Sequence, residues 1–229
     1  MHNRRHFLQS TLALSAACSV ATAASACPVP GLSALRPALI VYDRRFEAAR
    51  VFARAAARRA VAVRAIEGDV TALWYEDLSL RWRDPSVTVA GLTDASAQFC
   101  LQQLARPERR VVWRGEHLAG RDGRLLHTLQ VPEAMIGRVE AQLASAGIGN
   151  AGSARDRRAP AARAVRPGWP AVLAELLLSL PAARGTRRTL QLSGPADLAD
   201  TPPGLSGLEE PLLSWLIAPR HAPLAAGPA

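Results

Sequence analysis

Short apolar runs alternate with amphipathic segments in the first half of the chain. The run from 38 to 42 (ALIVY) is continuously apolar, which is typical of a strand buried on both faces of a parallel sheet. From 46 to 59, apolar residues recur at three- and four-residue spacing and arginines occupy another face, which predicts an amphipathic helix. The segment from 61 to 66 (VAVRAI) returns to strand character. Together they predict a right-handed strand–helix–strand unit with parallel strands.

The pattern continues through the middle of the chain. It predicts strands at 87–92, 110–113 and 125–131, and helices at about 94–105 and 132–146. The segment 70–84 contains two tryptophans and predicts a short helix or an ordered loop over the sheet. A turn that contains Asp122 and Gly123 joins two strand-like runs, which is a hairpin signal. We expect this hairpin to form an antiparallel edge of the sheet.

The second half of the chain is less regular. Residues 149–167 are small, arginine-rich and interrupted by proline, which predicts a flexible linker. A short apolar helix at 171–180 and strands at 189–192 and 215–217 follow, and the tail from 219 is expected to be disordered.

These elements predict an α/β fold. We expect a three-layer sandwich with a mostly parallel, Rossmann-like or flavodoxin-like sheet, an antiparallel edge hairpin and an irregular C-terminal extension. The expected organisation is an export signal at 1–26, an α/β domain at 27–148, a linker at 149–168 and an extension with a disordered tail at 169–229.

The N-terminus has the parts of an export signal. A basic start (NRRHFLQ, residues 3–9) precedes a short apolar stretch and small residues (ATAASA, residues 21–26), as in secretory signals and unlike a membrane span. The residues Arg4, Arg5, Phe7 and Leu8 resemble the twin-arginine (Tat) signal peptide, whose usual pattern is Ser/Thr-Arg-Arg-x-Phe-Leu-Lys; the flanking asparagine and glutamine depart from it. A general secretory signal is the alternative.

This resemblance implies export to the periplasm after folding, by the twin-arginine translocation machinery, and no transmembrane segment in the mature chain. Cleavage after Ala23 or Ala26 satisfies the small-residue rule. Cys27 then lies at the boundary, but the residues before it lack the Leu or Val that precedes a lipidated cysteine, so lipid anchoring is not favoured. Cys100 is expected in the core, and a Cys27–Cys100 disulfide is not expected.

The net charge of +9 comes from 28 arginines, with no lysine, against 19 acids. The arginines are scattered along the chain, and no nucleic-acid-binding signature accompanies them, so we do not expect nucleic acid as a partner.

Candidate chemistry lies at the carboxyl ends of the predicted strands, where ligands bind in open parallel sheets. The candidate ligand-site residues are Asp43, Asp69, Trp74, Thr93, Ser96, Glu116 and His117. Carboxylates that face a histidine there are suited to acid–base chemistry. The same residue types also serve as turn formers and helix caps, and the tryptophan as packing, in a protein without catalytic activity.

Several chemistries lack their sequence signals. The chain has no dinucleotide, P-loop or G-x-S-x-G motif and no paired cysteines. A catalytic zinc would need His117, His127 and a carboxylate. These histidines straddle the predicted hairpin turn, so they can face each other across two strands, although such histidines are more often ordinary surface or core residues. No metal is assigned, and the cofactor is unknown.

The sequence favours an exported, non-catalytic binding or accessory protein that acts on a small molecule or on another exported protein. The alternative is an exported hydrolase or redox enzyme with its site at Asp43, Asp69, Thr93 and His117. A structural factor of the cell envelope is a third class, favoured if Cys27 carries lipid.

Overall fold

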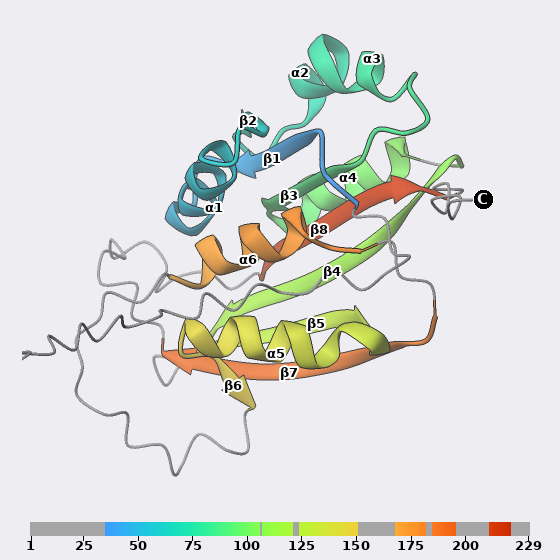
Figure 1. Ribbon diagram of the computed structural model, residues 1–229. Helices are drawn as coiled ribbons and strands as arrows, with labels where there is room; N and C mark the ends of the chain where they lie inside the picture. Colours follow the sequence, from blue (N-terminus) through green and yellow to red (C-terminus); the bar gives the residue numbers. More distant parts are fainter. Residues whose placement is uncertain are drawn as a thin grey trace, which may run out of the picture. The chain divides into compact units, whose positions relative to one another are not determined.

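An eight-stranded sheet in the order β2-β1-β3-β8-β4-β5-β7-β6 organises the part of the chain that the structure describes (Figure 1). The computed structural model describes residues 35–105, 107–120, 124–150, 168–181, 185–195 and 211–220. The strands are β1 (Leu39–Asp43), β2 (Ala62–Ile66), β3 (Val89–Thr93), β4 (Arg109–Ala119), β5 (Arg124–Pro132), β6 (Gly149–Asn150), β7 (Arg187–Pro195) and β8 (Leu212–Pro219).

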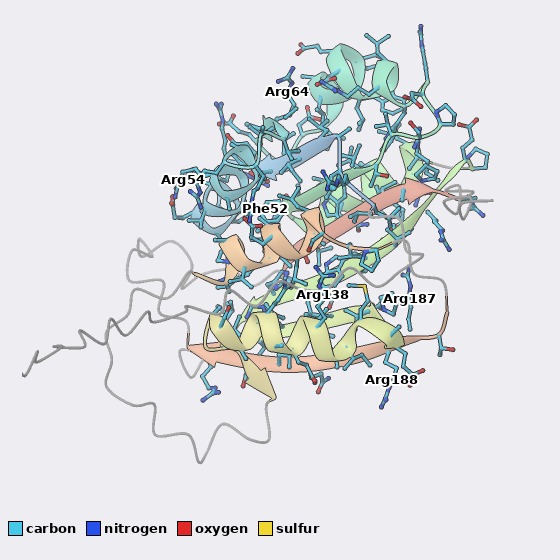
Figure 2. All side chains as sticks on the ribbon, in the orientation of Figure 1. Phe52, Arg54, Arg64, Arg138, Arg187 and Arg188 are labelled. Atoms are coloured by element: carbon cyan, nitrogen blue, oxygen red, sulfur yellow. The ribbon has the colours of Figure 1, made fainter. Side chains whose placement is uncertain are left out.

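The predicted strand–helix–strand unit is confirmed as β1, α1 (Glu47–Ala57) and β2. β1 is parallel to β2 on one side and to β3 on the other. α1 buries Phe52 and a row of alanines, and its arginines lie on the opposite face, where Figure 2 shows Arg54. The helix forms because alanine has the highest intrinsic helix propensity and because its apolar stripe has a core to cover.

The expectation of a mostly parallel sheet is wrong. Only the β1–β2 and β1–β3 pairs are parallel, and the other five neighbouring pairs are antiparallel. The cause is β8, which comes from the C-terminal part of the chain and runs antiparallel between β3 and β4. A Rossmann-like or flavodoxin-like three-layer sandwich is therefore not confirmed, whereas the mixed α/β class is.

Two other expectations change with β8. The β4–β5 hairpin forms as predicted, but it lies inside the sheet, because β8 pairs with β4 and β7 pairs with β5. The C-terminal part is not an irregular extension, because β8 is buried along its whole length and belongs to the centre of the sheet.

Helices and short helical turns complete the described chain. They are α2 (Thr71–Leu73), the π-helical turn η1 (Trp74–Leu78), α3 (Ser79–Arg81), α4 (Ala95–Leu104), the 3₁₀ turn η2 (Glu133–Met135), α5 (Ile136–Ser145) and α6 (Trp169–Leu178). One apolar cluster contains side chains of α1, α5 and α6, and a second contains side chains of α4 and the α2–α3 segment. Ile40 belongs to the first cluster and Leu39 and Val41 to the second, so each cluster occupies one face of β1.

Gly91 in β3 permits the tightest packing in the sheet. A Cβ atom at this position would lie 2.4 Å from the ring of Trp215 and 2.6 Å from the carbonyl oxygen of Val41. Glycine is therefore required where the β8 tryptophan packs closely against the neighbouring strand.

Some predictions fall outside the described residues. The export signal and Cys27 lie there, as do residues 151–167 of the predicted linker and the tail from 221. Cys100 is exposed on α4, so the prediction of a core cysteine is wrong. Within the described ranges, none of the helices has the length and apolarity needed to cross a membrane.

Candidate functional site

The parallel pairing of β1 and β3 brings Asp43 and Thr93 together at the carboxyl ends of these strands, as the sequence predicted. Asp43 is fully buried, and Arg45 holds its carboxylate through Nε at 2.9 Å and Nη2 at 2.5 Å. The same Nη2 also bonds the carboxylate of Asp94. One guanidinium therefore bridges two acids from neighbouring strand ends.

Gly68 makes room for this bridge. Its φ is +81°, in the left-handed region, and a Cβ at this position would lie 2.7 Å from the Arg45 guanidinium. The residue two positions after the end of β2 is thus small because the arginine passes over it. Hydrogen bonding to Asp43, followed by Asp94, raises the pKa of Arg45. The Arg45 guanidinium therefore stays charged at every physiological pH.

The remaining polar atoms at this end are also occupied. Asp94 is the N-cap of α4 and accepts a hydrogen bond from the Ala97 amide at 2.8 Å. The Thr93 hydroxyl accepts a bond from the Trp215 indole at 3.0 Å and donates to the Asp94 carbonyl oxygen at 3.1 Å. The acids and hydroxyl that the sequence offered for chemistry are thus used to fix the strand-to-helix connections.

Asp69 and Ser96 do not join this network. Asp69 accepts a bond from the Thr71 amide at 2.8 Å in the turn after β2, and hydrogen bonding with Thr71 lowers the pKa of its exposed carboxyl. Ser96 is exposed in the first turn of α4. Asp69 thus stabilises its local turn.

Trp74 and Glu116 each contact a neighbouring side chain outside this network. Trp74 packs edge-to-face on Trp82, with the ring centroids 5.9 Å apart. Glu116 pairs with Arg114 at 3.3 Å on the solvent side of β4.

His117 lies on the opposite face of the sheet from Thr93. In the register of β8, Thr93 is opposite Leu213, whereas His117 is opposite Leu212. Since successive residues of a strand point to opposite faces, the two side chains cannot share a pocket. The hypothetical catalytic set of Asp43, Asp69, Thr93 and His117 is therefore not assembled.

The prediction that His117 and His127 face each other is confirmed. They are directly opposed in the β4–β5 ladder, with their Nδ1 atoms 2.7 Å apart. The His117 Nε2 lies 2.9 Å from the Ser214 hydroxyl, and the ring stacks on Trp169 with centroids 4.6 Å apart. Both imidazoles are buried in the core, with 4% and 1% of their surface exposed.

The hydrogen-bond distances allow an assignment of the tautomers. The Trp113 indole can only donate, so the Ser214 oxygen accepts from it at 3.0 Å. The serine hydrogen has two acceptors in reach, the His117 Nε2 at 2.9 Å and the Gly115 carbonyl oxygen at 3.5 Å, and the shorter contact is the better hydrogen bond. We therefore assign Ser214 as the donor to His117 Nε2 and His117 Nδ1–H as the donor to His127. The His127 Nε2–H is then a buried donor that has no partner among the described residues.

Burial keeps this pair neutral. Desolvation and the proximity of His127 lower the pKa of His117, and desolvation lowers the pKa of His127 to about 4. Within the described residues, no cluster of three or more metal-ligating side chains is formed, so a carboxylate does not complete a zinc site at this pair. The pair forms a polar network of the core.

A groove that the sequence did not reveal lies where α4 ends and where β4 begins beside the end of β8. Its volume is about 240 Å³, and its lining residues are Gln102, Ala105, Arg109, Arg110, Val111, Ile217 and Arg220. The three arginines come from positions that are distant in the chain and adjacent in the β4–β8 ladder. Without that register, no local pattern could have grouped them.

No family model, curated protein or solved structure matches this chain. An account of function therefore depends on the geometry of the sites.

Proposed function

We propose that this chain is an exported periplasmic protein that binds a ligand without transforming it. The observation that carries the proposal is the Arg45 bridge, which bonds both Asp43 and Asp94. It lies at the carboxyl ends of the parallel strands, where enzymes with open parallel sheets bind their substrates. A general acid or base must exchange protons with a substrate. A carboxylate that is fully buried and bidentate to arginine is instead suited to holding two loops together.

The histidines support the same conclusion. His117 and His127 are buried, and three of their four ring nitrogens bond to one another or to Ser214. An exposed imidazole beside an unpaired acid would favour the alternative, an exported hydrolase or redox enzyme. Asp43, Thr93 and the two histidines instead form internal hydrogen bonds.

The proposal of export rests on the N-terminal sequence. Arg4, Arg5, Phe7 and Leu8 resemble a twin-arginine signal, which implies that the translocation machinery is a partner and that the protein crosses the membrane folded. The ligand is a small molecule or a second exported protein, and lipid anchoring at Cys27 is not part of the proposal.

Native mass spectrometry of the protein recovered from the periplasm of an expressing bacterium tests both parts. We expect a chain that begins at Ala24 or Cys27 and that captures a small molecule from the low-molecular-weight fraction of the same cells. The mass of the captured molecule should stay constant during prolonged incubation. A twin-lysine variant at Arg4 and Arg5 should remain unprocessed.

Two results would contradict the proposal. A captured molecule whose mass changes with time in the wild type but not in Asp43→Asn would place catalysis at the carboxyl ends of the strands. Processing and export that survive the twin-lysine substitution would favour the general secretory route.

A further inference from the structure

The groove at the β4–β8 end of the sheet contains an uncompensated group of arginines. Arg109 and Arg110 begin β4, and their partners in the ladder are Pro219 and Ala218 at the end of β8. Arg220 follows directly, so three arginines lie within two residues of one another across two strands. All three are among the residues that line a groove of about 240 Å³, together with Val111 and Ile217.

Arg109 is the structural member of the group. It is buried, with 3% of its surface exposed, and its guanidinium donates to the carbonyl oxygens of Val87 at 2.6 Å, Asp84 at 2.7 Å and Trp82 at 3.0 Å. It also lies over the Trp82 ring at 5.3 Å. These bonds tie the segment before β3 to the start of β4 and fix the wall of the groove.

The other arginines keep donors available. Arg220 uses its Nε to bond the Arg109 carbonyl oxygen at 3.3 Å. Arg110 is exposed and forms no side-chain hydrogen bond or ion pair with any residue in the described ranges. Arg187 of β7 donates to the Val111 carbonyl oxygen at 3.1 Å, and Figure 2 labels this arginine.

These guanidinium groups repel one another. Burial and the positive charge of Arg110 both lower the pKa of Arg187. The nearby acids, Glu108 and Asp84, act on Arg109, and Asp84 already accepts bonds from Ser86. Four arginines against two acids leave an excess of positive charge beside a low-dielectric wall, where the field is focused.

Several arginines elsewhere in the fold are paired with acids. On α1 and β2, Arg54 pairs with Glu47 and Arg64 pairs with Asp77. Arg109, Arg187 and Arg220 have only backbone carbonyl oxygens as side-chain hydrogen-bond partners within the described chain, and Arg110 has none there. Like charges held together without a counter-charge cost stability, and an anion that bridges them removes this cost.

We infer that the groove binds a small multivalent oxyanion, whose phosphate or carboxylate oxygens are shared between Arg110 and Arg220 with Arg187 at the rim. This inference rests on the proposed binding function and names its ligand class. The planar guanidinium fork matches the paired oxygens of both groups. The volume equals that of about eight liquid waters, which suits inorganic phosphate, a phosphorylated small molecule or a tricarboxylate.

Isothermal titration of the exported, processed protein with inorganic phosphate and separately with citrate tests the inference, with sodium chloride used to hold the ionic strength constant. We expect binding to the wild type and at least about a tenfold weaker affinity in Arg110→Gln, the loss expected from one charge-assisted hydrogen bond. The double variant Arg110→Gln/Arg220→Gln should show no binding. The matched control is Arg54→Gln/Arg58→Gln, which removes the same charge from two exposed arginines at α1.

Thermal unfolding separates binding from a structural role. Because Arg110 repels Arg187, Arg110→Gln should unfold at an equal or higher temperature without anion and should lose the stabilisation that the anion gives the wild type. A response to phosphate alone identifies a phosphate ligand, and a response to citrate alone identifies a carboxylate ligand; either supports the site.

Three outcomes would overturn the inference. Equal weakening in the control variant would show a general charge effect. A lower unfolding temperature of Arg110→Gln with an unchanged anion response would show that Arg110 stabilises the fold and does not bind the anion. If neither anion binds, the groove is not an oxyanion site, and a ligand captured in native mass spectra would then leave the binding function itself intact.

Discussion

The buried histidine pair predicts a specific pH dependence of stability. His127 is 1% exposed, and its pKa is about 4 in the fold against an ordinary value of 6.5. Below pH 6.5 the unfolded chain binds a proton that the folded chain does not. The contribution of His127 is therefore fully present above pH 6.5, and it is lost as the pH falls from there towards 4. The difference corresponds to about 3 kcal/mol of unfolding free energy.

Urea unfolding of the wild type and of His127→Gln, followed by tryptophan fluorescence, measures this contribution. The unfolding free energies of the two proteins are compared at several pH values between about pH 8 and pH 4. At neutral pH the variant should be less stable, by about 1–3 kcal/mol, because it loses ring packing and the bond to His117. As the pH falls, the gap should shrink by about 3 kcal/mol or reverse.

Carboxylates titrate in both proteins, so they cancel in the difference between wild type and variant. Two stability curves that run parallel from neutral to acid pH would show that His127 is not buried as a neutral imidazole. The assignment of the Ser214 network would then be wrong as well.

Three further predictions concern single positions. Gly91→Ala should lower the free energy of unfolding by about 1–3 kcal/mol through overpacking. Gly137→Ala on α5, where an added Cβ meets nothing within 4 Å, should raise the free energy of unfolding by up to about 1 kcal/mol. Equal effects of the two variants in chemical denaturation would argue against the close approach of β8 to β3. Asp43→Asn should cost about 1–3 kcal/mol and Asp69→Asn less than about 1 kcal/mol, and the reverse order would contradict the buried Arg45 bridge. The Cys100 thiol should react with a maleimide in the native protein, as mapped by peptide mass, and protection until denaturation would show that it is covered.

Local sequence patterns were sufficient for the N-terminal unit of the fold. The continuous run of β1 and the three- and four-residue spacing of α1 depend on neighbours within one or two turns. The N-cap at Asp94 is equally local, since a short side-chain oxygen satisfies an amide three residues later. The facing of His117 and His127 followed from a hairpin whose turn fixes the register.

The position of β8 could not be read from its own sequence. The segment 212–219 (LLSWLIAP) is apolar on both faces, which is typical of a central strand but does not specify the neighbours or the direction. The expectation of a mostly parallel sheet extended the first unit to the whole domain. Antiparallel insertion of a C-terminal strand between β3 and β4 depends on long-range packing, including the fit of Trp215 against Gly91.

The candidate sites also combine residues that local patterns predicted with contacts that only the long-range fold creates. Asp43 and Thr93 were predicted as site residues because each ends a strand. Their structural role depends on Arg45, which bonds Asp94 at a separation of 49 positions and passes over Gly68. The groove depends on the start of β4 lying beside the end of β8, more than 100 positions later in the chain. Cys100 was misplaced because α4 carries apolar residues on its outer side as well, including Phe99 with 60% of its surface exposed.

The central claim is that the strand-end acids are structural and that the arginine groove is the binding site. Its most direct test follows the arginine Nε–H resonances by nitrogen-15 NMR during titration with phosphate or citrate. We predict that the resonances of Arg110 and Arg220 move with saturation while that of Arg45 stays fixed. Movement of Arg45 with the groove arginines unchanged would place the ligand at the carboxyl ends of β1 and β3 and contradict the account.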